Sequence, residues 1–187
     1  MIGLKELLMR IIRAINSSAV KYWLLIGNVA GFFYFPELIT RDIDIAILFR
    51  NSQDIETFIH SLELEGFPIT EGDKRSLASR KRTIITLEDS PFYIDLLPVV
   101  HDVEIFMDAW NHRIEEDIDG YKISIPTFEY WIILKLYAGR DEDYVVVKKA
   151  ITHATNIGIS INMELIQKLA KKYNIKERLH RIIKLLD

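Results

Sequence analysis

Two carboxylates separated by a single residue are the clearest candidates for chemistry in this chain. Asp42 and Asp44 lie in the apolar stretch 40–47, and strand alternation would place both on one face while the intervening isoleucines enter a core. Like charges held side by side repel, and a hard divalent cation such as Mg2+ or Mn2+ relieves that repulsion. The spacing therefore indicates a metal site, although a solvated strand face would have the same spacing.

The stretch upstream of these acids has the pattern of a phosphate-binding turn. Tyr22 to Ile26 is strand-like, Gly27 and Asn28 follow, and the residues from Val29 to Phe35 are typical of a helix. Glycine lets the backbone approach a ligand closely, and the unpaired N–H groups of a helix start attract anions. Gly27 and Asn28 are thus predicted to bind phosphate.

A third carboxylate lies in the apolar run 92–100. Asp95 interrupts this strand-like run, and a lone acid in such surroundings needs a partner. A metal ion shared with Asp42 and Asp44 would supply one.

Together these motifs resemble the hG[G/S]…DhDh…D pattern of the nucleotidyltransferase superfamily that includes DNA polymerase beta. The resemblance covers about residues 20–150 and is closest to the minimal nucleotidyltransferases and the AbiEii-like toxins of toxin–antitoxin systems. The family usually has Gly or Ser where this chain has Asn28. An Asn amide can still donate to a phosphate, but the substitution bears on activity.

The segment 124–143 also resembles the region after the core in those relatives, where a helix carries a lysine followed by an Arg/Asp cluster. The resemblance implies that Lys135 contacts the nucleotide, although a lysine in this apolar context can also extend to the surface. Asp143 is expected to cap the next helix, with pairing to Lys135 as the alternative.

The resemblance implies a metal-dependent transfer of a nucleoside monophosphate from an NTP to an acceptor hydroxyl. Asp42 and Asp44 would hold the metal ions, and Asp95 would share one of them and accept the proton of the acceptor. The acceptor would be the 3′ end of tRNA, a small molecule or a protein side chain. Two rivals are a toxin–antitoxin component that binds an antitoxin partner with a weakened catalytic site, and an α/β binding domain with solvated acids.

Composition restricts the class of protein. The 187 residues carry a net charge of −3 and contain no cysteine, which excludes disulfides, thiolate metal sites and thiol nucleophiles. No apolar run is long enough to cross a bilayer, so no membrane association and a cytoplasmic location are expected.

The hydrophobic pattern predicts an α/β (α+β) fold with a mixed central sheet, flanking helices and further helices at the C-terminus. Residues 1–125 would form the nucleotidyltransferase-like core and 126–187 a helical region, unless the chain is one continuous domain. Helices are expected at 2–15, from about 51 to 65, at 103–117, from 127, at 144–155, and as a pair in 162–187. Further strands are expected at 67–70, 83–87 and near 121–125.

Two basic segments stand out in this acidic chain, at 74–82 and 168–184. Concentrated Lys and Arg are what recognition of a phosphate backbone requires, so these segments favour RNA, in particular tRNA, as acceptor. A charged exposed turn and a solvated helix face are the alternatives.

Overall fold

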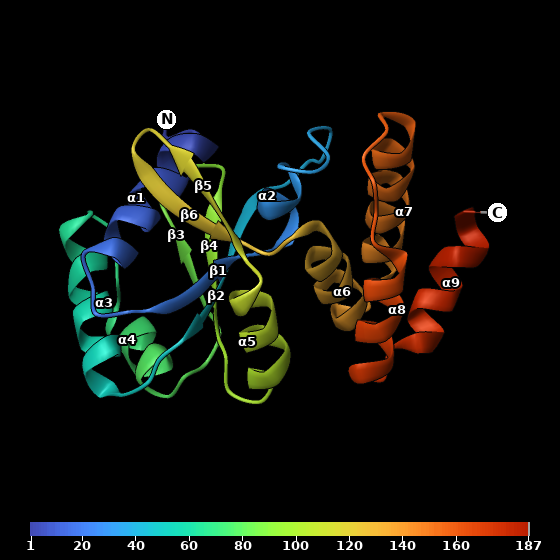
Figure 1. Cartoon of the computed structure of the whole chain (residues 1–187). Helices are drawn as coiled ribbons and strands as arrows, with labels where there is room; N and C mark the ends of the chain where they lie inside the picture. Colours follow the sequence, from blue (N-terminus) through green and yellow to red (C-terminus); the bar gives the residue numbers. More distant parts are fainter. Residues whose placement is uncertain (187) are drawn as a thin grey trace.

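A mixed four-stranded sheet organises the chain, and the computed structural model describes residues 1–186 (Figure 1). The strand order is β1 (Tyr22–Leu25), β2 (Asp42–Leu48), β4 (Tyr93–Pro98) and β3 (Thr83–Thr86). The central pair β2 and β4 is parallel, whereas both outer strands pair antiparallel. The mixed α/β fold with flanking helices is as predicted.

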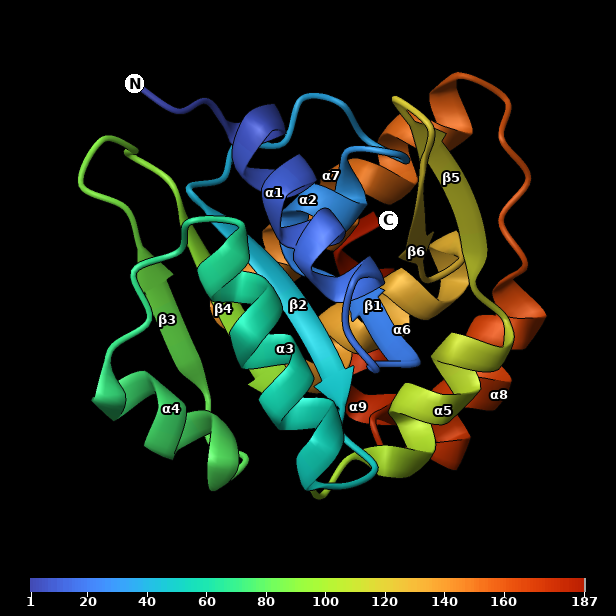
Figure 2. The same ribbon diagram turned by 90° about the vertical axis from the view of Figure 1, so that its left-hand side faces the viewer.

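Three helices cover one face of the sheet: α1 (Leu4–Asn16), α3 (Ser52–Leu64) and α4 (Glu71–Ala78) (Figure 2). Alternate residues of the central strands, such as Ile43 and Ile94, are completely buried. Burial of these side chains accounts for the apolar half of the alternating pattern, and the acids of the same strands lie on the opposite face.

The remaining helices lie beyond the opposite face, and those at the C-terminus form a second lobe (Figure 1). A single hydrophobic cluster contains residues of both lobes. The proposed division at residue 125 stays a prediction. The elements are α2 (Gly27–Gly31), α5 (Val103–Asn111), the hairpin β5 (Ile114–Ile118) and β6 (Tyr121–Ile125), and the helices α6 (Phe128–Ala138), α7 (Asp141–Asn156), α8 (Met163–Lys172) and α9 (Lys176–Leu186).

The prediction of a strand at residues 67–70 is wrong. This segment is irregular and leads into α4, so most of the basic segment 74–82 is helical rather than a loop. A capping box explains the difference, because the Thr70 hydroxyl accepts from the backbone N–H of Asp73 while the Asp73 carboxylate accepts from Thr70.

The prediction of a helix at residues 103–117 is wrong for the second half of that range. Helix α5 ends at Asn111, and Ile114–Ile118 pairs with β6 instead. Asp119 and Gly120 both adopt positive φ, at 53° and 83°, as a two-residue hairpin turn requires.

Other helix bounds differ only at their ends. Helix α2 begins at Gly27 and ends at Gly31, where a helix from 29 to 35 was expected, and α7 begins at Asp141 rather than residue 144. Within residues 1–186, no helix has the length and apolar character needed to cross a membrane. The cytoplasmic location stays a prediction.

Candidate active site

The parallel pairing of β2 and β4 brings two of the predicted acids together. Asp44 lies directly opposite Asp95 in the register, and residues paired across a sheet point to the same face. Asp42 lies two residues earlier on the same face, opposite Tyr93. The sheet itself therefore gathers Asp42, Asp44 and Asp95.

Asp42 is held at the edge of this group by two hydroxyl groups. The Thr40 hydroxyl donates to Oδ1, and the Tyr93 hydroxyl lies 3.4 Å from Oδ2. Asp42 does not line the cavity around Asp44 and Asp95. Asp42 is half-buried and shares the sheet face of Asp44, so one ligand could contact both carboxylates.

Asp95 is buried and already has a cationic partner. The Arg82 Nε donates to Oδ1 at 2.8 Å and to Oδ2 at 3.0 Å, and the terminal nitrogen of Arg82 also donates to Oδ2. Only 4% of the Asp95 side chain is exposed, against 61% of the Arg82 side chain. The partner of this buried acid is thus Arg82, which directly precedes β3.

Gly27 brings the backbone against the Asp44 carboxylate. Its φ is +66°, and a Cβ at this position would lie 1.8 Å from the Asp44 Oδ2. The indole of Trp131 donates to the Gly27 carbonyl at 2.8 Å and fixes the turn against α6. The turn therefore requires glycine for both its conformation and its close approach.

Lys135 of α6 links this helix to α2 and α7 beside the site. Its buried Nζ donates to the Asn28 Oδ1 at 2.8 Å and lies 3.1 Å from the Asp143 Oδ1. Arg140 holds the other oxygen of Asp143 at 2.9 Å. The Lys135–Asp143 pair, an alternative in the sequence analysis, is thus present, and the Asp143 carboxylate also accepts from the backbone N–H of Arg140 as a helix cap.

Burial and like charges perturb Asp44. Burial, followed by the nearby charges of Asp42 and Asp95, raises the pKa of Asp44 to about 6, against the opposing influence of Lys135 and Arg140. Ionised Asp44 is therefore poorly compensated by the protein alone.

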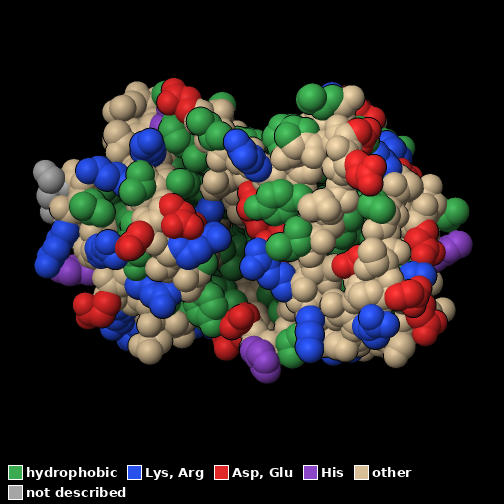
Figure 3. Space-filling model, turned by 180° about the vertical axis from the view of Figure 1, so that it is seen from behind, with side chains coloured by type: hydrophobic (Ala, Val, Ile, Leu, Met, Phe, Trp, Pro, Cys, Tyr) green, Lys and Arg blue, Asp and Glu red, His purple; other side chains and the backbone are tan. Residues whose placement is uncertain are grey.

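The cavity in front of Asp44 and Asp95 has a volume of about 300 Å³ and is lined from both lobes. Figure 3 shows the hollow between the lobes, with hydrophobic side chains inside and charged side chains at its edges. Three cationic residues line the cavity: Arg82, Lys135 and Arg140. Carboxylates surrounded by cations suit a ligand that carries both a metal ion and phosphate groups.

The carboxylates suit Mg2+ only in company with a substrate. Within residues 1–186, no group of three or more His, Asp or Glu side chains is arranged to hold a metal ion. Mg2+ is commonly bound through one or two carboxylates plus substrate phosphates and water, which the Asp42 and Asp44 pair could provide. Asp95 could join them only after Arg82 moves aside.

A family described as a nucleotidyl transferase of unknown function (DUF2204) matches residues 4–186. The chain belongs to this family. Nucleotidyl transfer is thus supported at the level of the family, whereas the expected closeness to AbiEii-like toxins is not confirmed. No curated protein matches the chain.

Two solved structures are similar to the chain in overall fold. TM1012 from Thermotoga maritima, whose own assignment as a nucleotidyltransferase is provisional, is 16% identical, with a TM-score of 0.48 and coverage of 82% of this chain and 96% of that one. JHP933 from Helicobacter pylori is 14% identical, with a TM-score of 0.46 and coverage of 96% and 83%. Likeness at this level carries no conclusion about substrates.

The sequence pattern predicted no individual role in the site for Arg82 or Arg140. Arg82 belonged to the basic segment 74–82, and its partner Asp95 is revealed only by the pairing of β3 with β4. Arg140 precedes Asp143 by three residues, and that local spacing could have indicated their ion pair.

Several of the basic residues predicted to contact RNA form ion pairs or hydrogen bonds within the protein instead. Lys74 pairs with Glu63 and Glu71, and Lys172 pairs with Glu104 and Asp108. In the C-terminal segment, Arg178 donates to backbone carbonyls of α6, and Arg181 pairs with Asp141. These two arginines therefore stabilise the helical lobe.

Proposed function

We propose that this protein transfers a nucleoside monophosphate from an NTP to an acceptor hydroxyl, with Mg2+ or Mn2+ as cofactor. The observation that carries the proposal is the pairing of Asp44 with Asp95 on adjacent parallel strands, directly against the backbone of Gly27. Membership of the nucleotidyl transferase family supports the same reaction class.

Asp42 and Asp44 would hold the metal, which supplies charge neutralisation of the triphosphate when bound. Gly27 lets the backbone lie directly against the Asp44 carboxylate. Asn28 and Lys135 would bind the phosphates from α2 and α6. Because the protein contributes little covalent chemistry to such a transfer, positioning of the two substrates is its main task.

In the transfer, the acceptor oxygen forms a bond to the α-phosphorus and the bond to the β-phosphate bridging oxygen breaks. Pyrophosphate leaves with that electron pair, and the acceptor proton passes to Asp95. Arg82 now holds both oxygens of Asp95, so it must move aside before the proton can be accepted. In its displaced position the guanidinium would be free to bind phosphate.

The acceptor is proposed to be RNA, in particular tRNA, and a role as the toxin of a toxin–antitoxin pair stays a prediction. The test is incubation of the protein with each α-labelled NTP, Mg2+, total RNA and cell lysate. Label in RNA that falls steeply with added salt supports an RNA acceptor. Label confined to protein bands or small molecules refutes the RNA assignment, and absence of label from every pool counts against transfer.

A second candidate is a partner-binding protein with a weakened site. The contacts of two side chains favour it: Asn28 accepts a hydrogen bond from Lys135 and donates one to the Ile39 carbonyl, and Asp95 is paired with Arg82. Such a protein would bind a partner without transferring label to any acceptor. The same incubation therefore distinguishes it from an active transferase.

A further inference from the structure

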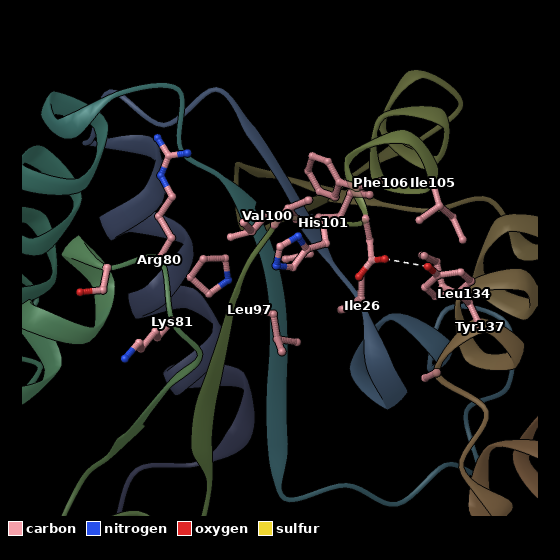
Figure 4. A pocket seen from close by; sticks show the side chains of 17 residues that line it. Ile26, Arg80, Lys81, Leu97, Val100, His101, Ile105, Phe106, Leu134 and Tyr137 are labelled. Carbon is pink, nitrogen blue, oxygen red and sulfur yellow. Dashed lines mark hydrogen bonds between the residues drawn. The ribbon is translucent and has the colours of Figure 1, made fainter. Parts of the chain in front are cut away.

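A large cleft adjoins the carboxylate site and has no role in the chemistry described so far. Its volume is about 740 Å³, within the range of pockets that hold small organic ligands. Its walls are largely apolar and include Phe106 of α5 together with Leu134 and Tyr137 of α6 (Figure 4). Such walls suit a flat, uncharged ring system.

The cleft continues the same face of the sheet that carries the acids. Ala46 lies two residues after Asp44, and Leu97 lies two residues after Asp95, so strand alternation places both on the carboxylate face. Leu97, with Leu134 of α6, lines both the cleft and the cavity around Asp44 and Asp95. A molecule in the cleft can therefore present one end to Asp95.

The edge of the cleft is cationic. Arg80 and Lys81 line it from the connection between α4 and β3, opposite α6, with their charged ends extending away from the apolar side chains (Figure 4). Within residues 1–186, neither side chain forms an ion pair or a hydrogen bond. The carboxylate in the lining, Asp102, accepts a hydrogen bond from the Tyr137 hydroxyl at 2.6 Å. This charge distribution favours an anionic ligand over a cationic one.

Arg80 occupies a backbone conformation that usually belongs to glycine. Its φ is +52°, and the N–H groups of Arg80 and Lys81 donate to the carbonyls of Leu77 and Ser76 in the pattern of a Schellman helix end. The other residues with positive φ, glycines aside, are Asp119 and Asn174 within residues 1–186, and both types tolerate this region. An arginine here costs stability, and such strain tends to occur at functional sites.

We propose that this cleft is the acceptor site and that it takes a nucleotide unit. The base lies against the apolar walls, the phosphate binds Arg80 and Lys81, and a ribose hydroxyl reaches Asp95. The inference rests on the proposed nucleotidyl transfer and adds the chemical class and the place of the acceptor. The 3′-terminal residue of an RNA and a free mononucleotide share this chemistry.

The test follows label from an α-labelled NTP with Mg2+ to three acceptors. These are a short RNA with a free 3′ end, the same RNA with a terminal residue lacking both ribose hydroxyls, and a free 5′-mononucleotide. Label in the free-ended RNA alone identifies an RNA end as the source, and label in the mononucleotide identifies a free nucleotide. Label in the blocked RNA, or label in none of the three while lysate compounds of other classes are labelled, overturns the proposal.

Arg80→Gly tests the residue that distinguishes this cleft. Removal of a cationic phosphate contact is expected to raise the KM for the acceptor roughly tenfold. The KM for the NTP is expected to stay unchanged, and the melting temperature to stay equal or rise. Lys21→Ala removes one positive charge from the segment before β1, outside the cleft lining and outside both basic segments, and is expected to change none of these values.

An unchanged acceptor KM in Arg80→Gly overturns the proposal while leaving nucleotidyl transfer in place. If the unmodified protein neither gains thermal stability from Mg2+ with any NTP nor transfers label, the proposed function fails, and the acceptor site fails with it.

Discussion

Arg82 and Asp95 form the ion pair that controls access to the third carboxylate of the site. The arginine is mostly exposed and the acid is buried, so the guanidinium covers Asp95 at its open side. A metal ion or an acceptor proton that is to reach Asp95 has to compete with it.

Arg82→Gln is expected to destabilise the metal-free protein by about 2 kcal/mol, because it leaves a buried carboxylate without its cation. Mg2+ or Mn2+ should then raise the melting temperature of this variant more than that of the unmodified protein. Thermal melts with and without metal measure the difference. Lys122→Gln, which removes an exposed partner of Glu115, is the control, and equal metal effects in all three proteins would contradict competition at Asp95.

Gly27→Ala is expected to damage the site through Asp44. The methyl group would overlap the Asp44 carboxylate, and the left-handed backbone would cost a further 1–2 kcal/mol, approximately. Both the melting temperature and nucleotide binding should therefore fall. Gly120 also has a positive φ, but a Cβ there would meet no atom within 4 Å, so Gly120→Ala should lower stability alone. Normal nucleotide binding by Gly27→Ala would refute the close-approach argument.

Asp44→Asn is expected to stabilise the ligand-free protein in a pH-dependent way. A carboxyl whose pKa is higher in the folded than in the unfolded state binds its proton more tightly when folded, so ionisation disfavours the fold. With the pKa of Asp44 raised to about 6, this penalty develops between about pH 4 and 6 and is complete above. We expect Asn to stabilise by roughly 1–2 kcal/mol at pH 7.5 and little at pH 4. Denaturant melts at both pH values measure this, and an equal effect at each would contradict the burial argument.

Arg178→Ala is expected to lower stability by about 1–3 kcal/mol, because the Leu136 and Tyr137 carbonyls at the end of α6 lose their donor. Lys171→Ala removes the same charge from α8 and should change stability by less than about 0.5 kcal/mol. Thermal melts compare them. If Arg178→Ala melts like Lys171→Ala, the arginine is a surface charge rather than a helix cap. RNA binding is therefore better tested at Lys171.

The carboxylate group could be predicted from sequence because each acid interrupts a strong apolar strand pattern. Alternation gives the face of Asp42 and Asp44, and Asp95 lies in a comparable run. Arg82 could not be predicted, since its role depends on which strands are neighbours. No local spacing links it to Asp95, thirteen residues away in the chain.

The elements missed from sequence have weak local signals. Helix α4 buries one side chain, Leu77, and its other residues are polar or small, so its capping box is the main indication of a helix. Strand β5 follows α5 closely and alternates half-buried with exposed residues, and its pairing with β6 decides its conformation.

Asp42 and Asp44 are proposed to hold a metal–nucleotide complex beside Gly27. The most direct measurement is the melting temperature with Mg2+ and each of the four NTPs, since a ligand bound only to the folded state raises it by mass action. We predict a rise with at least one NTP that requires Mg2+ and disappears in Asp42→Asn and in Asp44→Asn, each compared with its own ligand-free melt. An unchanged melting temperature with all four NTPs, or an equal rise in both variants, would contradict the claim.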